Sequence, residues 1–118
     1  MVRIVCKSKI TNACVTNKEM KYSGSLGIDK DIMEASNLLP GEQVHVLNVN
    51  NGERLTTYAI EEQAGSGKVV IYGPAARKGE PGDELVILSY CSMETEECRN
   101  FNMRVIALGE NNTVKPNQ

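Results

Sequence analysis

Apolar residues recur along much of this chain at every second position, which is the period of a β-strand. In the first such segment, Val2, Ile4 and Cys6 alternate with Arg3, Val5 and Lys7. Five later segments share this short, β-branched character and are bounded by turn residues: 43–49, 54–60, 68–72, 84–90 and 103–108. Each of the six is therefore predicted to be a strand.

Turn-forming residues separate the predicted strands. Asn51-Gly52 joins the segments 43–49 and 54–60, and this pair is typical of a tight hairpin. The run Ala-Gly-Ser-Gly at 64–67 is predicted to be a second hairpin loop, between 54–60 and 68–72.

Only two short helices are predicted. One covers 29–39, with Asp29 as its N-cap, and ends before Pro40. The other is one or two turns within 93–100, and the polar segment 109–118 is predicted to be a flexible tail. Many short strands with little helix predict a mainly β fold, in which residues 1–118 form a single small, closed or nearly closed β-barrel.

Composition narrows the class of protein. The net charge is −2 and the basic residues are scattered, whereas a nucleic-acid-binding surface needs clustered Lys and Arg. One Phe and no Trp leave little for bases to stack on. The longest apolar stretch, 85–88, is far too short to span a bilayer. We therefore expect a cytoplasmic protein that binds neither nucleic acid nor membrane.

The usual catalytic and metal-binding motifs are missing from the sequence. There is no Gly-rich dinucleotide fingerprint, P-loop or HExxH motif. The four cysteines have no CxxC spacing and the chain has a single histidine, so no metal site is predicted and free thiols are expected. The lone His45 is interpreted as an ordinary strand residue.

The pair Gly24-Ser25 interrupts the strand-like segment 21–29 and has two interpretations. One is a turn or bulge. The other is self-cleavage, in which the serine hydroxyl attacks the preceding carbonyl carbon and converts the amide to an ester; glycine leaves that approach open. Elimination and hydrolysis would then leave a pyruvoyl group, a ketone that forms a Schiff base with an amine and acts as an electron sink. The same dipeptide recurs at 65–66, in the predicted loop, so the dipeptide alone does not decide between a turn and self-cleavage.

The surrounding sequence does decide. The whole chain resembles the pyruvoyl-dependent aspartate 1-decarboxylase family. Five blocks carry the resemblance: KSKI at 7–10, YSGSLGID at 22–29, NVNNGERLTTYAI at 48–60, YGPAARKGEPGD at 72–83 and VILSYCSM at 86–93.

This resemblance implies a double-psi β-barrel that assembles into a homotetramer with active sites between subunits. It also implies a zymogen that cleaves itself between Gly24 and Ser25 into fragments 1–24 and 25–118, with Ser25 becoming the pyruvoyl cofactor. The implied reaction is decarboxylation of L-aspartate to β-alanine and carbon dioxide, for pantothenate and coenzyme A biosynthesis. Whether a maturation factor assists the cleavage is not predicted.

The resemblance also implies residue roles. Ser25 and Tyr58 match the catalytic residues, with Tyr58 as the proton donor, and Gly24, Ser25 and Thr57 match the self-processing residues. The residues that match the substrate-binding positions are Lys9, Arg54, Tyr22, Gly73, Ala75 and Ala76. Lys9 and Arg54 are the expected carboxylate ligands, and a guanidinium suits this role because it can donate two parallel hydrogen bonds.

The period of the predicted strand 54–60 bears on three of these residues. Arg54 and Tyr58 share one face of the strand, and Thr57 lies on the other. Without the resemblance, Arg54 would be interpreted as a surface residue and Tyr58 as a cross-strand packing residue.

Four positions depart from the family pattern. Thr11 stands where many members have histidine, Leu47 where some have tryptophan, and Tyr72 where many have asparagine. Pro74 lies in a turn that is usually alanine-rich and has no N–H to donate. Two alternatives therefore stay open from the sequence: the same chemistry on another acidic amino acid such as glutamate, and a non-catalytic barrel that serves as a binding or assembly module.

Overall fold

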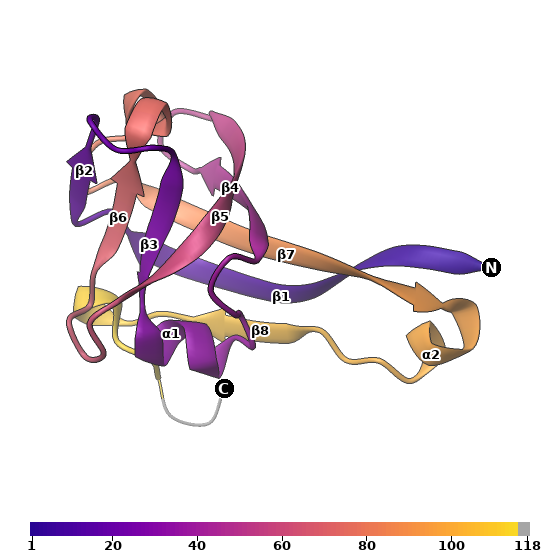
Figure 1. Cartoon of the computed structure of the whole chain (residues 1–118). Coiled ribbons are helices and arrows are strands. Elements are labelled where there is room, and N and C mark those ends of the chain that lie inside the picture. The colour runs from indigo at the N-terminus through magenta and orange to yellow at the C-terminus, as the bar shows by residue number, and fades with distance from the viewer. Residues whose placement is uncertain (116–118) are drawn as a thin grey trace.

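The computed structural model describes residues 1–115, and its main feature is one sheet of eight strands (Figure 1). The strands are β1 (Val2–Cys14), β2 (Asn17–Glu19), β3 (Ser25–Asp29), β4 (Gln43–Asn48), β5 (Arg54–Glu62), β6 (Val69–Tyr72), β7 (Glu84–Glu94) and β8 (Arg104–Ala107). Their order across the sheet is β2-β6-β3-β5-β4-β7-β1-β8. All six predicted strands are present, and the mainly β prediction is confirmed.

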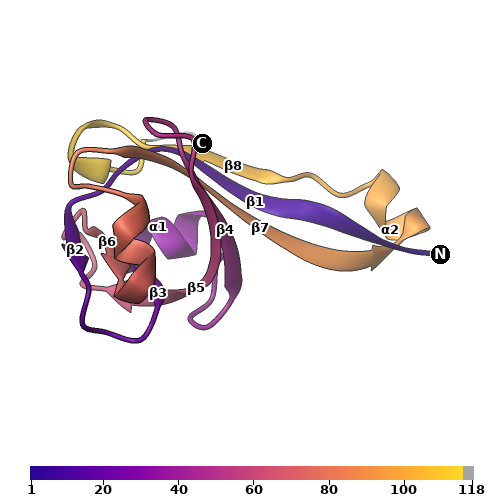
Figure 2. The ribbon, with the colours of Figure 1, turned by 90° about the horizontal axis from the view of Figure 1, so that it is seen from above.

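The chain path makes the sheet curl into a small barrel-like fold (Figure 2). β1 lies near one end of the strand order and runs almost directly into β2, which lies at the other end. Two backbone hydrogen bonds hold this junction, from Val15 N to Asp83 O and from Thr16 N to Val69 O, each 2.9 Å long. The two ends of the sheet are therefore brought together, and the strands enclose one core.

Strand alternation separates a core-facing side of the sheet from an outer face. On the core side, the buried residues include Ile10, Leu26, Ile28, Val44, Val46, Ala59, Ile71, Leu85 and Ile87, each at most 2% exposed. The residues between them point outward. These outward-pointing residues form the outer face of the sheet, which includes Lys9, His45, Arg54 and Tyr58.

The two predicted α-helices are present, and the first is shorter than predicted. α1 (Lys30–Ala35) begins after Asp29, whose Oδ1 accepts a hydrogen bond from Asp31 N at 2.8 Å. It stops at Ala35 rather than continuing to residue 39, because Asn37 adopts a left-handed conformation with φ of 60°. α2 (Thr95–Arg99) begins with a capping box between Glu94 and Glu97.

The prediction of a hairpin loop at 64–67 is wrong. β5 and β6, which this segment connects, do not pair, because β3 lies between them, parallel to β5 and antiparallel to β6. The connection instead crosses the end of β3, where Asp29 accepts hydrogen bonds from Gly65 N at 3.1 Å and Gly67 N at 2.8 Å. The second Gly-Ser pair is therefore part of a structural crossover.

Part of the predicted tail packs against the barrel. η2 (Glu110–Asn112) is a short 3₁₀ turn in which Asn112 is only 3% exposed. The Asn112 side chain donates to Cys14 O and Gly67 O, both at 2.8 Å, and accepts from Cys14 N at 2.7 Å. Residues 116–118 of that tail lie outside the described residues.

β1 and β7 extend beyond the barrel as an arm that also carries α2 (Figure 2). Large apolar side chains lie open on this arm, including Ile4 at 75% exposed and Val2 at 60%. Within residues 1–115 no helix has the length and hydropathy needed to cross a membrane.

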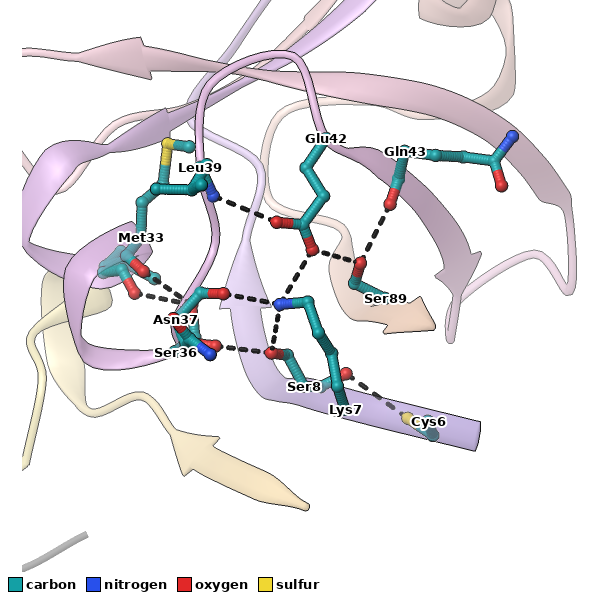
Figure 3. A network of polar contacts seen from close by, with 11 residues as sticks. Cys6, Lys7, Ser8, Met33, Ser36, Asn37, Leu39, Glu42, Gln43 and Ser89 are labelled. Carbon is teal, nitrogen blue, oxygen red and sulfur yellow. Dashed lines mark hydrogen bonds and ion pairs between the residues drawn. The ribbon is translucent and has the colours of Figure 1, made fainter. Parts of the chain in front are cut away.

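A half-buried ion pair ties β1 to the segment before β4 (Figure 3). Lys7 Nζ lies 2.8 Å from Glu42 Oε2, and Glu42 also accepts a hydrogen bond from the Ser89 hydroxyl of β7. Burial alone would raise the pKa of Glu42, but the hydrogen bonds from Lys7 and Ser89 outweigh it and hold that pKa below its ordinary value. This network joins three segments that are far apart in the sequence.

Candidate active site

Gly24-Ser25 lies where β3 begins, and not inside a strand as the sequence suggested. Residues 20–22 form a turn, and Ser25 is the first residue of β3, paired with Tyr72 of β6. Ser25 is only 4% exposed, whereas Tyr22 is 62% exposed. The Gly24–Ser25 bond therefore joins an open turn to a buried strand end.

Close backbone packing surrounds this bond. Gly73 begins the 3₁₀ helix η1 (Gly73–Lys78) with φ of 77°, a conformation that favours glycine. A Cβ at Gly73 would lie 2.6 Å from Tyr22 O and 2.7 Å from both Gly24 Cα and Gly24 N. Only glycine therefore lets η1 start directly against the backbone of residues 22–24.

Ser25 and Tyr58 lie on the same face of the sheet. β3 and β5 are parallel with Leu26 opposite Ala59, and both of these residues are buried in the core. Ser25 and Tyr58 come one residue earlier on the two strands, so both point to the outer face. They line one pocket together with Tyr22, Ser23, Ile60, Glu61, Glu62 and Tyr72.

Thr57 lies on the opposite face from Tyr58, as the strand period predicts. It pairs with Val44 of β4 and is half-buried. Continuing the parallel register back from Leu26–Ala59 places Thr57 level with Gly24. Within residues 1–115 no side-chain hydrogen bond joins Thr57 to Ser25, so its proximity to the cleavage bond rests on strand register.

Arg54 lies in a different pocket, lined by Ile4, Gln43, His45 and Tyr90. It comes four residues before Tyr58 on β5, which separates the two positions by about 13 Å along the strand. The His45 and Tyr90 rings meet edge to face at 5.0 Å in the same pocket. Arg54 therefore does not line the pocket of Ser25 in the same chain.

Lys9 is also remote from Ser25. It pairs with Leu88 of β7, which in turn pairs with His45 of β4, so Lys9 lies on the outer face in one cross-strand row with His45. β1 and β3 are separated in the sheet by β5, β4 and β7. A single chain thus brings Ser25, Tyr22 and Tyr58 together and leaves Lys9 and Arg54 elsewhere on the outer face.

The remaining predicted residues belong to η1. Ala76 is completely buried in the core, and Ala75 is half-buried against it. Neither side chain lines the pocket of Ser25. They anchor the helix whose first residue, Gly73, packs on the cleavage segment.

The sequence did not predict the polar pair formed by Tyr72 and Glu62 in this pocket. The Tyr72 hydroxyl donates a hydrogen bond to Glu62 Oε2 at 2.8 Å. Burial, together with the hydrogen bond and negative charge of Glu62, raises the pKa of Tyr72 to about 12. The sequence contained one signal for this pair: Glu62 follows Tyr58 by four residues and therefore shares its face of β5.

The comparisons with known proteins agree with the resemblance. The family model described as aspartate decarboxylase matches residues 1–115. The chain belongs to the aspartate decarboxylase family. It is 49% identical over 112 residues to the aspartate 1-decarboxylase of Thermoanaerobacter pseudethanolicus, covering 95% of this chain and 96% of that protein.

Two further relatives of this family carry the same name. The aspartate 1-decarboxylase of Caulobacter vibrioides is 44% identical, with 98% of each chain covered. That of Dehalococcoides mccartyi is 57% identical over 91 residues, which cover 77% of this chain and 73% of that protein. The similarity thus includes both the cleavage segment and β5.

Of the four positions expected to depart from the family pattern, only Tyr72 lines one of these two pockets. Leu47 of β4 pairs with Arg54 of β5, and Thr11 is half-buried on β1. Pro74 lies in the first turn of η1, where a missing N–H is tolerated. Tyr72 is the departure that lies closest to the Gly24–Ser25 bond.

Proposed function

We propose that this protein decarboxylates L-aspartate at its α-carbon, giving β-alanine and carbon dioxide for pantothenate biosynthesis, after it has cleaved its own chain at Gly24–Ser25. The observation that carries the proposal is the pairing of Ser25 with Tyr58 in one pocket, in a chain of the aspartate decarboxylase family. The relatives favour neither another acidic substrate nor a non-catalytic barrel. A cytoplasmic location stays a prediction from the sequence.

Self-cleavage needs only groups of this chain and one water molecule. The Ser25 hydroxyl attacks the Gly24 carbonyl carbon, the C–N bond breaks, and an ester joins the two segments. Elimination across Cα and Cβ of Ser25 then releases the Gly24 carboxylate and leaves dehydroalanine. Hydrolysis of that residue consumes the water, releases ammonia and leaves a pyruvoyl group. We propose that two residues level with each other in the register assist the first step: Gly24 leaves the approach open, and the Thr57 hydroxyl supports the acyl shift.

The surroundings of Ser25 fit a small ketone at this position. Ser25 is 4% exposed and is covered on the pocket side by Tyr22, Tyr58 and Tyr72. When formed, the pyruvoyl group supplies the electron sink that decarboxylation of an amino acid requires. Tyr58 is 41% exposed on the same face and is the proposed proton donor to the substrate α-carbon.

The carboxylate ligands point to an assembled enzyme. Lys9 and Arg54 lie on the outer face but outside the pocket of Ser25. A second copy of the chain that packs on this face would bring its Arg54 and Lys9 to the Ser25 pocket of the first. Ile4 and Tyr90, both exposed beside Arg54, are the apolar contacts available for such packing. We therefore propose a homotetramer with active sites between subunits, in line with the family resemblance.

The test is carbon dioxide release from L-aspartate by the purified protein. We expect turnover by the wild-type chain and none by Ser25→Ala, because the variant cannot form the ketone. L-Glutamate serves as the comparison substrate and should turn over far more slowly. Equal rates for wild type and Ser25→Ala would overturn the proposal.

A further inference from the structure

Two tyrosines and a glutamate form a connected cluster beside the cleavage bond. Tyr72 donates its hydroxyl proton to Glu62 Oε2 at 2.8 Å. Its ring meets the ring of Tyr22 edge to face, with centroids 5.1 Å apart and an interplanar angle of 70°. Glu62 therefore holds Tyr72, and the Tyr72 ring supports one edge of Tyr22, which is 62% exposed.

Gly27 provides the space in which this cluster sits. A Cβ at Gly27 would lie 2.1 Å from Glu62 Oε2 and 2.9 Å from Tyr72 Cε2. The φ of Gly27 is not in the left-handed region, so glycine is required here for space and not for conformation. The outer face of β3 is thus left bare at the point where the Glu62–Tyr72 pair crosses it.

The cluster holds both sides of the Gly24–Ser25 bond. On one side, Tyr22 lies two residues before Gly24 in the turn. On the other, Tyr72 is the strand partner of Ser25, and its carbonyl oxygen lies 3.9 Å from the position that a Cβ on Gly24 would take. Displacing the Tyr72 side chain would therefore disturb the backbone on which the bond rests.

We infer that Glu62 is a positioning residue for self-cleavage: through Tyr72 and Tyr22 it holds the Gly24–Ser25 bond in the geometry from which the Ser25 hydroxyl attacks. The inference rests on the proposed self-cleavage and adds the device that prepares it. In an intramolecular reaction, orientation contributes a large part of the rate, and small displacements reduce it severely. Glu62, Tyr72 and Tyr22 together form a clamp on the bond. Glu62 touches none of the reacting atoms in this scheme and acts only through Tyr72 and Tyr22.

The test is the cleavage rate of freshly made chains in a cell-free translation extract, followed by intact mass after translation is stopped. We expect Tyr72→Phe and Glu62→Ala each to slow cleavage by about 10- to 100-fold. Because both changes break the same hydrogen bond, the double variant should be no slower than the slower single variant. Glu62→Gln keeps an acceptor oxygen and should recover most of the wild-type rate.

Two further variants separate positioning from general damage. Gly27→Ala should slow cleavage, because the added methyl group displaces both the Glu62 carboxylate and the Tyr72 ring. Glu96→Gln removes one carboxylate from the exposed α2 and should cleave at the wild-type rate. Far-UV circular dichroism and thermal melting of each variant check the fold.

The outcomes distinguish the inference from the proposed function. If the wild-type chain cleaves and Tyr72→Phe and Glu62→Ala cleave equally fast, the clamp is refuted while self-cleavage stands. Independent, multiplying effects of the two changes would also refute it, because they would show no shared interaction. If the wild-type chain does not cleave at all, the proposed function fails and the clamp fails with it.

Discussion

At the scale of single residues, the proposed function gives Ser25 and Tyr58 separate tasks although they line one pocket. In the proposed mechanism Ser25 first reacts with its own backbone, and this maturation is complete before the resulting ketone meets substrate. Tyr58 is partly exposed on the same face, where it can reach a bound amino acid. Processing and turnover should therefore be separable by mutation.

Tyr58→Phe tests this separation. We expect the variant to cleave as the wild type does, because the phenol has no part in the acyl shift. Decarboxylation per cleaved chain should fall by about 10²- to 10⁴-fold, the usual contribution of a positioned proton donor. Intact mass measures the first quantity and β-alanine formation the second. Unchanged turnover, or cleavage slowed in parallel with turnover, would contradict the assignment.

The Glu62–Tyr72 pair predicts a spectroscopic signature. The chain has four tyrosines and no tryptophan, so tyrosinate absorbance reports the tyrosines directly. Burial and the hydrogen bond and charge of Glu62 together raise the pKa of Tyr72 to about 12, with smaller effects from Tyr22 and Glu19. Glu62→Gln removes the charge and should let Tyr72 ionise at lower pH.

The titration is carried out over the pH range in which circular dichroism shows the folded protein. Tyr72→Phe should lose the ionisation that Glu62→Gln shifts, which assigns that ionisation to Tyr72. If the curves of Glu62→Gln and wild type coincide, Tyr72 and Glu62 are not paired in solution.

At the scale of elements, most strands could be predicted because their alternation is local. Val44 and Val46, for example, are buried on β4, while His45 lies on the outer face. The prediction of a hairpin at 64–67 was wrong because β3 inserts between β5 and β6. This pairing is non-local, and the loop sequence contains no signal for it. The predicted length of α1 was too great because Asn37 adopts a left-handed conformation, although the helical sequence pattern continues beyond it.

The same distinction explains the candidate site. The family resemblance predicts roles for Ser25, Tyr58 and Arg54, and the strand period correctly placed Thr57 on the other face of β5. Glu62 was missed because its contact with Tyr72 depends on the register across β3 and on the bare surface at Gly27. Neither feature can be derived from spacing along the chain.

The Lys7–Glu42 pair predicts a pH-dependent contribution to stability. The pKa of Glu42 is lowered in the folded protein, so its charged form stabilises the fold above its ordinary value of 4.5. This contribution is lost as the pH falls from there through the lower folded pKa. Glu42→Gln should lower the free energy of unfolding by about 1–3 kcal/mol at neutral pH.

Urea denaturation at pH 7 and at successive acidic pH values checks this prediction. The difference between wild type and Glu42→Gln should shrink as the pH falls. As a control, Glu96→Gln removes an exposed carboxylate and should change stability little at any pH. A difference between wild type and Glu42→Gln that is constant with pH would show that the ion pair is not its source.

At the scale of the whole molecule, the proposed function requires a catalytic unit larger than one chain, because Arg54 and Ser25 line different pockets. If each active site takes Ser25 from one subunit and Arg54 from another, two inactive variants should complement each other. Co-expressed Ser25→Ala and Arg54→Ala chains should form mixed assemblies that contain some intact sites. We expect each variant alone to be inactive and the mixture to regain a measurable fraction of wild-type turnover.

Light scattering should show assemblies of about four times the 12.9 kDa chain mass in all three preparations. Mixing the separately purified, preassembled variants without exchange of subunits is the control and should restore nothing. Mixed assemblies of the expected size that stay inactive would place Arg54 and Ser25 in the same subunit's site, or Arg54 outside the site.

The most direct test of the account is the intact mass of the purified wild-type chain beside that of Ser25→Ala. We expect two wild-type fragments, 1–24 and 25–118, and the larger one should be lighter by one ammonia than a simple hydrolysis product with an N-terminal serine. Ser25→Ala should stay a single chain of 118 residues. A wild-type chain that stays whole, or a larger fragment that begins with an unmodified serine, would contradict the account.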